Sequence, residues 1–551
     1  MRRPVIIFAI ILLLQTPLFA QLPKHEVRAV WLTTLNGLDW PSVKATNSES
    51  IERQKRQLTT ILDQLQKANV NTVLFQSRVR GTTIYPSEIE PWEGCLTGTP
   101  GRNPGYDPLQ FAIDECHRRG MEIHAWVVAI PVGKWNAIGC KRLRERNPSL
   151  IHKIGDEGFM NPEKPQTGEY IAKICGEIVD KYDVDGIHLD YIRYPENWKL
   201  TISKDRGRSY ITGIVRQINQ RVKSSKPWVK LSCSPIGKFN NLTRYPSRGW
   251  NAYDVVCQDA QGWLREGLMD QLYPMMYFKG DNYYPFAVDW ADNAYGRTIV
   301  SGLGVWLLSR REGSNWPLME ITRELNVSRG LGMGHCYFRS RFFTDNVKGL
   351  YHYVSNDFDK YPALIPPMTW QSSALPTPPK GLTLNNKGNI LEIRWWGAQN
   401  NSNSPTIFYN VYSSTCYPVN IQDVRNLIAH HLTQESLSIR DDDGRHYYAV
   451  TAMDRYGNES SATQSNVLAE PVIEYLRNDG TRLQLPEIDR DFGTRYIRIE
   501  SLMGNTMLQR AYTKTTKEIV IRTLPDGVYR VKSVDKNKVA RHIGQFIIKR
   551  Q

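Results

Sequence analysis

Between residues 26 and 366, short apolar runs alternate with longer segments in which apolar residues recur three or four positions apart. The first pattern is typical of buried strands and the second of amphipathic helices. Eight strands are predicted, at Val27 to Thr34, Thr72 to Ser77, Glu122 to Val128, Gly186 to Asp190, Leu231 to Pro235, Gln271 to Tyr277, Ile299 to Val305 and Gly332 to Phe338. The helical segments between them include Ser50 to Ala68, Pro108 to Arg119, Thr167 to Tyr182 and Tyr210 to Lys223.

Strands that alternate with helices in this way predict an α/β fold, a TIM (β/α)8 barrel over residues 21–365. A doubly wound open sheet is the alternative, and it usually carries a glycine-rich phosphate turn after its first strand. The segment Thr33-Thr34-Leu35-Asn36-Gly37 does not have this glycine pattern. The barrel is therefore the favoured fold.

A proline-rich stretch at residues 366–379 predicts a linker after the barrel, since it contains Pro366-Pro367 and Pro376-Thr377-Pro378-Pro379. Beyond it, apolar and polar residues alternate in short runs, which is typical of half-buried strands. Two small all-β sandwich domains are predicted, at residues 380–470 and 471–551.

Residues 1–20 have the pattern of a cleavable signal peptide. Arg2 and Arg3 precede an apolar run from Val5 to Leu14, and Ala20 stands before Gln21. The run is shorter than a helix needs to span a bilayer. We therefore expect an exported protein, in the periplasm, at the cell surface or outside the cell, with no integral membrane segment after cleavage.

Composition narrows the classes of partner. The formal net charge is +15, and a basic exported protein can meet anionic glycans or surfaces. No long Lys/Arg block and no nucleic-acid module stands out, so nucleic acid is not an expected partner. The eight cysteines form no Cys-x-x-Cys pair and have no histidines clustered beside them, which indicates buried thiols. We expect neither a metal site nor a cofactor.

The fourth predicted strand carries the most informative residues. It runs Asp185-Gly186-Ile187-His188-Leu189-Asp190, and Tyr191 and Arg193 follow it directly. Catalytic groups of (β/α)8 barrels lie at the carboxyl ends of the strands, so Asp190 is a candidate catalytic carboxylate. The alternative is that Asp190 and Arg193 simply pair to close the loop.

Aromatic, polar and charged residues also follow the other predicted strands. Aromatic rings can stack on sugar rings while polar groups bind their hydroxyls, so convergence of these residues at one rim predicts a carbohydrate cleft. For any single aromatic residue or histidine, packing in the core is the alternative. The candidate substrate-binding residues are Trp31, Gln76, Arg78, Arg80, Trp92, His124, Trp126, His188, Tyr191, Arg193, Tyr273 and Tyr277.

Several ordered motifs carry a family resemblance. They are Glu26-Val27-Arg28-Ala29-Val30-Trp31, Tyr85-Pro86-Ser87-Glu88, Gly105-Tyr106-Asp107-Pro108, His124-Ala125-Trp126, the strand that ends at Asp190, and Gln258-Asp259-Ala260. Together they resemble the glycosyl-hydrolase-like 10 family of exported bacterial proteins, over roughly Glu26 to Asp359. The resemblance implies a TIM-barrel glycoside hydrolase that acts on a polysaccharide, and family members include an enzyme of peptide-free peptidoglycan strands.

The resemblance also implies that Asp190 is the catalytic carboxylate, acting as the nucleophile. Glycoside hydrolysis generally needs a second carboxyl group to protonate the leaving oxygen. Asp259 is the first candidate and Glu90, in the loop after the second strand, is the second. An equally good interpretation of Asp259 is a helix cap.

Departures from the family pattern keep a second function class open. Thr82 or Thr83 stands where the family pattern commonly has an aspartate. Val128-Ala129 stands where the pattern commonly has an Asn-Pro pair. The alternative to a glycosidase is therefore a non-catalytic carbohydrate-binding or scaffold protein on the same barrel. Arg193 could keep Asp190 ionised or bind a carboxylate of the substrate.

The two C-terminal domains carry resemblances of their own. A proline-rich entry, Trp395 on the second strand, and the strand Tyr448-Ala449-Val450-Thr451-Ala452 resemble a fibronectin type III domain, which usually acts as a spacer. Ser501-Leu502-Met503-Gly504-Asn505 and Leu524-Pro525-Asp526-Gly527 resemble the C-terminal sorting domain of the type IX secretion system in Bacteroidetes. This second resemblance implies secretion machinery as a partner.

Overall fold

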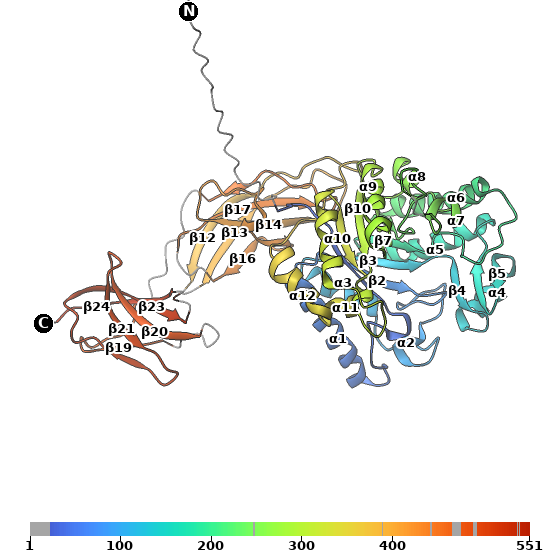
Figure 1. Cartoon of the computed structure of the whole chain (residues 1–551). Coiled ribbons are helices and arrows are strands. Elements are labelled where there is room, and N and C mark those ends of the chain that lie inside the picture. Colours follow the sequence, from blue (N-terminus) through green and yellow to red (C-terminus); the bar gives the residue numbers. More distant parts are fainter. Residues whose placement is uncertain are drawn as a thin grey trace, which may run out of the picture. The chain divides into compact units, whose positions relative to one another are not determined.

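The computed structural model describes residues 22–245, 248–387, 390–440, 444–465, 475–486, 488, 493–536, 538 and 540–550 (Figure 1). The predicted signal peptide, residues 1–20, lies outside the described residues. Apart from the short segment Gln422–Arg425, the chain divides into two compact units between Pro367 and Met368. Each unit is described by itself.

Eight parallel strands close into a barrel in the first unit, which confirms the predicted fold class. Each strand pairs with its neighbour along the chain, and β1 pairs with β11 to complete the ring. The barrel strands are β1 (Arg28–Leu32), β2 (Thr72–Arg78), β3 (Glu122–Val128), β7 (Gly186–Asp190), β8 (Lys230–Cys233), β9 (Gln271–Leu272), β10 (Thr298–Leu303) and β11 (Gly334–Tyr337).

Amphipathic helices follow the strands. The long helix after β7 begins at Lys204, before the predicted start, because the side chain of Ser203 accepts a hydrogen bond from the backbone N–H of Arg206. The α-helices of this unit are α1 (Ser48–Lys67), α2 (Gly94–Thr97), α3 (Pro108–His117), α4 (Ile138–Arg146), α5 (Pro165–Lys181), α6 (Lys204–Ser225), α7 (Ala252–Val255), α8 (Ala260–Arg265), α9 (Tyr284–Asp292), α10 (Leu318–Gly330), α11 (Ser340–Thr344) and α12 (Leu350–Tyr353).

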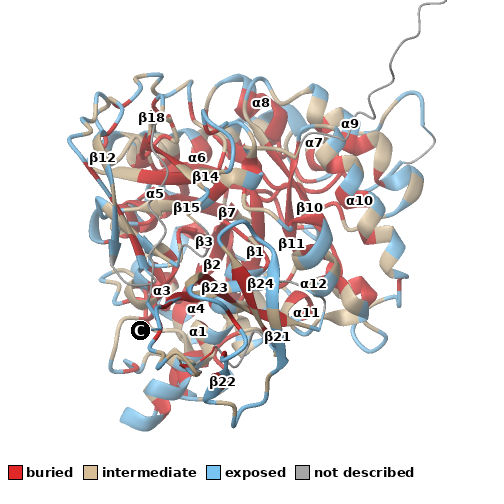
Figure 2. Cartoon of the chain, turned by 90° about the vertical axis from the view of Figure 1, so that its left-hand side faces the viewer, coloured by how far each residue is buried: buried red, intermediate tan, exposed pale blue. Residues whose placement is uncertain are grey.

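Successive side chains of a barrel strand point alternately outward, toward the helices, and inward, into the barrel, so the apolar residues form two layers. On β3, Ile123, Ala125 and Val127 pack outward against the large core beneath the helices, whereas Trp126 and Val128 belong to a second cluster inside the barrel. The strands are accordingly buried on both faces, and the helices keep exposed outer faces (Figure 2). By the same alternation, every second residue of a strand points into the barrel.

The strands of this unit differ from the sequence expectation in two places. The strand predicted at Gln271 to Tyr277 is only Gln271–Leu272, because Pro274 has no N–H to give to the sheet. After β3 the chain also forms a small antiparallel sheet, in the order β4 (Pro131–Lys134), β6 (Glu157–Met160), β5 (Ile151–Ile154), which the sequence analysis did not predict.

A buried network of charges closes the barrel at the amino-terminal ends of its strands. Arg28 on β1 contacts Glu26 at 2.8 Å and Asp359 at 3.2 Å, and Arg329 contacts the same two carboxylates at 2.6 Å. His335 on β11 lies 3.0 Å from Asp359. Residues more than 300 positions apart in the chain are thus joined at one end of the barrel.

The second unit is built of small antiparallel sheets. Two of them, β12-β13-β16 and β15-β14-β17-β18, share a core in which Trp395 packs edge-on against Tyr409 at 5.5 Å between ring centroids. The remaining sheets are β21-β20-β23-β24 and β19-β22. The strands are β12 (Lys380–Lys387), β13 (Ile390–Trp396), β14 (Ile407–Ser414), β15 (Leu427–Leu432), β16 (Ser436–Ile439), β17 (Tyr447–Asp454), β18 (Thr463–Gln464), β19 (Arg482–Gln484), β20 (Thr494–Ser501), β21 (Thr506–Ala511), β22 (Glu518–Val520), β23 (Gly527–Asp535) and β24 (Ala540–Ile548).

None of the helices in the described part of the chain has the length and apolar composition that crossing a membrane requires.

Candidate functional site

Asp190 stands at the carboxyl end of β7, where its carboxyl group is held by three hydrogen bonds. Trp126 donates from Nε1 to Oδ2 at 3.2 Å. Ser234, just after β8, donates from Oγ to Oδ1 at 2.9 Å, and the backbone N–H of Tyr191 donates to Oδ1 at 2.8 Å. Donors from the strands on both sides of β7 therefore fix the carboxyl group.

The surroundings of Asp190 shift its acidity. Burial raises the pKa of Asp190 above its ordinary value, while the hydrogen bond from Ser234 and the charge of Arg193 lower it in part. The next residue, Tyr191, has a φ of 53°, in the left-handed region that non-glycine residues seldom adopt. Such backbone strain is concentrated at functional sites, and here it turns the chain immediately after the carboxylate.

Directly beneath Asp190, His188 lies fully buried inside the barrel. Trp31 donates from Nε1 to His188 Nε2 at 3.1 Å, so the proton of the neutral ring is on Nδ1, which donates to Ser232 Oγ at 3.0 Å. Burial lowers the pKa of His188 well below its ordinary value. Tyr273 packs edge-on against His188 and is also fully buried. The side chains of Trp31, His188 and Tyr273, expected to bind substrate, thus form a supporting layer.

His124 lies deeper still, toward the amino-terminal ends of the strands. Its Nε2 is 3.1 Å from Glu122, which also accepts a hydrogen bond from Lys230 at 2.6 Å. A Cβ atom at position 186 would come within 2.6 Å of the His124 ring, so Gly186 is required there for close packing. His124 was expected to bind substrate, and its position inside the barrel gives it a packing role instead.

Arg78 and Glu90 form a buried pair with two parallel hydrogen bonds, 2.8 Å and 2.6 Å long. Tyr170 donates to the same carboxylate at 2.9 Å, and Arg78 also donates to the carbonyl oxygens of Val128 and Ala129. Both oxygens of Glu90 are engaged, and its side chain is only 3% exposed. The pair fixes the loop after β2 against the end of β3.

Asp259 is the N-cap of α8. Its Oδ1 accepts a hydrogen bond from the backbone N–H of Gly262 at 3.1 Å, the contact that the capping interpretation predicts. The carboxyl group is only partly buried, and its Oδ2 is not used in this cap. Asp259 therefore has the structural contact that the capping interpretation predicts, made through one of its two carboxyl oxygens.

Three further residues that were predicted to bind substrate, Gln76, Trp92 and Arg80, make contacts with groups other than Asp190. Gln76 Oε1 accepts hydrogen bonds from Thr33 Oγ1 and from two backbone N–H groups of the loop after β1, so it organises that loop. Trp92 packs against the outer core. Arg80 is 43% exposed and lies 3.7 Å from Glu157, which places it on the surface near the small β4-β6-β5 sheet.

Arg193 does not pair with Asp190. Its Nη2 donates to Glu196 at 2.6 Å, and its guanidinium lies over the ring of Tyr191 at 4.1 Å. Tyr277 packs against Phe338 with ring centroids 5.4 Å apart, and its hydroxyl is buried without a hydrogen-bond partner among the described residues. Tyr191, Arg193 and Tyr277 thus stay with Asp190 and Trp126 at the carboxyl ends of the strands.

The roles of Ser234 and Glu196 were not predicted from the sequence. The inward direction of Ser234 could have been predicted from the alternation along the strand. Leu231 and Cys233 pack outward, so Ser232 and Ser234 point into the barrel. Glu196 lies in a loop, whose course the hydrophobic pattern does not predict.

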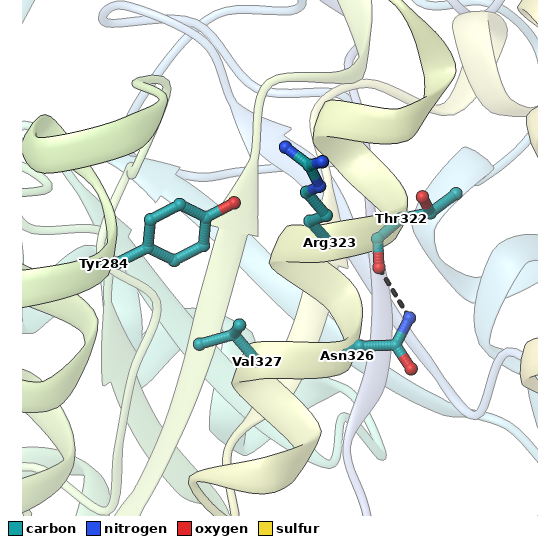
Figure 3. Close-up of a pocket in the computed structure, with 5 residues that line it drawn as sticks. All are labelled: Tyr284, Thr322, Arg323, Asn326 and Val327. Atoms are coloured by element: carbon teal, nitrogen blue, oxygen red, sulfur yellow. Dashed lines mark hydrogen bonds between the residues drawn. The ribbon is translucent and has the colours of Figure 1, made fainter.

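Among the described residues, no group of three or more His, Cys, Asp or Glu side chains is placed to hold a metal ion. A shallow hollow lies between α9 and α10, lined by Tyr284, Thr322, Arg323, Asn326 and Val327 (Figure 3). None of its residues belongs to the group around Asp190.

Comparisons with known proteins point to one family. The sequence profile of the family described as glycosyl hydrolase-like 10 matches residues 26–203 and 195–301. Glycosyl hydrolase YngK of Bacillus subtilis is 30% identical over 483 residues, which cover 80% of this chain and 93% of the relative. Glycosyl hydrolase DigH of Escherichia coli is 33% identical over 350 residues, covering 53% of this chain and 79% of the relative.

Among solved structures, the glycoside hydrolase domain of PgaB from Bordetella bronchiseptica is similar with a TM-score of 0.41 and 12% identity, over 60% of this chain and 98% of that one. The closed barrel and the family match define a protein of the glycosidase class. The chain belongs to the glycosyl hydrolase-like 10 family.

Proposed function

We propose that this protein is an exported glycoside hydrolase that uses Asp190 as its catalytic carboxylate. The observation that supports the proposal is the placement of Asp190, at the carboxyl end of a barrel strand with its oxygens oriented by Trp126, Ser234 and the N–H of Tyr191. A nucleophile must be held in a fixed direction toward the anomeric carbon, and three donors provide that direction.

Hydrolysis with two carboxyl groups then needs an acid. Separations of about 5 Å lead to retention and about 6.5–9.5 Å to inversion. Asp259 remains our first candidate, because its Oδ2 is not used in the cap of α8. Glu90 is the weaker candidate, because Arg78 and Tyr170 engage both of its oxygens.

The substrate that we propose is a bacterial cell-wall glycan, peptide-free peptidoglycan, or another polysaccharide. The family and the net charge of +15 support an exported protein that acts on wall glycans. Export rests on the signal peptide predicted at residues 1–20. We further propose that residues 380–470 are a fibronectin type III-like spacer and that residues 471–551 engage secretion machinery as a sorting domain.

A second candidate function is carbohydrate binding without turnover. It is favoured by one observation: both expected partner carboxylates, Asp259 and Glu90, have structural contacts. Replacement of family residues at Thr82-Thr83 and Val128-Ala129 points the same way.

Product analysis by mass spectrometry separates the two functions. The parent protein and Asp190→Asn are incubated with peptide-free peptidoglycan strands and with a panel of other glycans. We expect the parent to release oligosaccharides from at least one glycan and the variant to release none. Absence of turnover by the parent on every glycan, with binding retained by both proteins, would support the binding function instead.

A further inference from the structure

Beside Asp190, the loop after β7 carries a stack of two rings and one guanidinium. The guanidinium carbon of Arg193 lies over the rings of Tyr191, at 4.1 Å from the ring centroid, and of Trp250, at 5.7 Å. The side chain of Arg193 is only 3% exposed, whereas Trp250 is 38% exposed. Cation–π contact thus fixes Trp250 against the loop and leaves part of the indole open to solvent.

The positive charge of Arg193 is balanced by the carboxylate of Glu196. Glu196 accepts a hydrogen bond from Arg193 Nη2 at 2.6 Å, and Tyr191 donates its hydroxyl hydrogen toward the same oxygen at 3.4 Å. Burial raises the pKa of Glu196, but the charge and hydrogen bond of Arg193 outweigh it and leave the pKa below its ordinary value. Glu196 is therefore ionised at neutral pH, and its side chain is 43% exposed.

We propose that Trp250, Arg193 and Glu196 form a sugar-binding subsite that takes a neutral ring, a hexose or an N-acetylhexosamine. The proposal rests on the proposed glycosidase function, for which it specifies one part of the substrate. The indole offers a flat surface for the apolar face of a sugar, and the exposed carboxylate accepts hydrogen bonds from sugar hydroxyls.

The same contacts disfavour an anionic ring at this position. A substrate carboxylate would need the guanidinium, but Arg193 is covered by the rings and paired with Glu196. Bringing a second carboxylate beside Glu196 would add repulsion between like charges. The ion pair of Arg193 and Glu196 therefore makes this subsite prefer a neutral sugar ring over an anionic one.

Binding to Asp190→Asn protein, which cannot turn substrate over, tests the subsite. Isothermal titration calorimetry is run with tetra-N-acetylchitotetraose and with tetragalacturonate on the full chain. We expect the neutral probe to bind more tightly and Trp250→Ala to weaken it at least about tenfold, which corresponds to about 1.4 kcal/mol. The matched control is Trp396→Ala, a 52% exposed tryptophan on β13, which should leave the affinity unchanged.

A second variant tests the charge. Glu196→Gln leaves Arg193 unpaired, so we expect the ratio of tetragalacturonate to chitotetraose affinity to rise at least about tenfold. Glu266→Gln is the matched control, because Glu266 is also 43% exposed and pairs with Arg216 at 2.8 Å.

The inference and the proposed function can fail separately. Turnover that is lost in Asp190→Asn, combined with affinity unchanged by Trp250→Ala, would overturn the subsite alone. Affinity that depends on Trp250, without turnover by the parent, would overturn the glycosidase alone. Tighter binding of tetragalacturonate by the Asp190→Asn protein, or no binding of the neutral probe, would also overturn the subsite.

Discussion

Ser234 donates a hydrogen bond from Oγ to Asp190 Oδ1 at 2.9 Å, which joins the ends of the adjacent barrel strands β8 and β7. The bond stabilises the charged form of Asp190, because a hydroxyl hydrogen is attracted more strongly to a carboxylate than to a neutral acid. It counters the effect of burial, which raises the pKa of the same group.

Replacing Ser234 by alanine should raise the pKa of Asp190. A nucleophile is active when ionised, so the acidic limb of the kcat/KM profile should move to higher pH, by about one unit. Ser225→Ala is the control, because Ser225 makes the same kind of hydrogen bond, 2.8 Å long, to Asp180. An unchanged profile in Ser234→Ala would show that the serine does not tune the carboxylate.

Substitution of Asp259 by asparagine separates capping from catalysis. Asparagine caps helices as well as aspartate does, so the stability of the fold should be unchanged. If Asp259 is the acid, as we propose, kcat should fall by about 10²–10⁴-fold. Asp107→Asn serves as control, because Asp107 caps α3 through two backbone N–H groups and should leave kcat unchanged. Full activity of Asp259→Asn would assign Asp259 to the cap alone.

Glu90→Gln should destabilise the barrel. Because Arg78 would keep a buried charge with a weakened partner, the free energy of unfolding should fall by about 3–5 kcal/mol, measured by urea denaturation. Glu88→Gln is the comparison: Glu88 is 84% exposed and pairs with Lys181 at 3.0 Å, so the loss there should stay below about 1 kcal/mol. Unchanged stability in Glu90→Gln, with kcat lost, would instead make Glu90 the catalytic acid.

The charge network around Asp359 should make the free energy of unfolding of the barrel depend on pH. Burial alone would raise the pKa of Asp359, but Arg28, His335 and Arg329 lower it to about 2, from an ordinary value of 3.8. A lowered pKa stabilises the folded state above pH 3.8, and that stabilisation is lost as the pH falls toward 2.

The variant Asp359→Asn tests the network around Asp359. In Asp359→Asn, thermal unfolding at neutral pH should occur at a lower temperature than in the parent, and the difference should shrink below pH 4, where protonation of Asp359 begins in the unfolded chain. Asp345→Asn is the control, because its 3.3 Å pair with Arg341 is exposed. A difference that stays constant down to pH 2 would refute the assignment.

The barrel was predictable because its strands and helices leave different patterns in the sequence. The strands are buried on both faces and appear as short apolar runs, whereas the helices bury one face and repeat apolar residues every three or four positions. The small sheet of residues 131–160 was missed because four-residue strands with partly exposed faces resemble loops.

The position of Asp190 was predictable from the end of an apolar run, but its neighbours were only partly so. The Arg78–Glu90 pair forms because the loop after β2 folds back, and nothing in the hydrophobic pattern determines that course. Trp31 and His188 were correctly placed on their strands, but their depth depends on which residues face inward. The alternation along a strand predicts whether a side chain points into or out of the barrel. How far it lies from the carboxyl ends of the strands depends on how the side chains inside the barrel pack.

The contact between Arg329 and Glu26 also affects how the chain is made. Strand β1 is synthesised first, yet one of its two partners, β11, begins at Gly334, and Asp359 follows later still. Until about 360 residues have left the ribosome, β1 and the newest strand remain open edges that could pair with other chains. Closure of the barrel therefore has to wait until most of this unit has been synthesised.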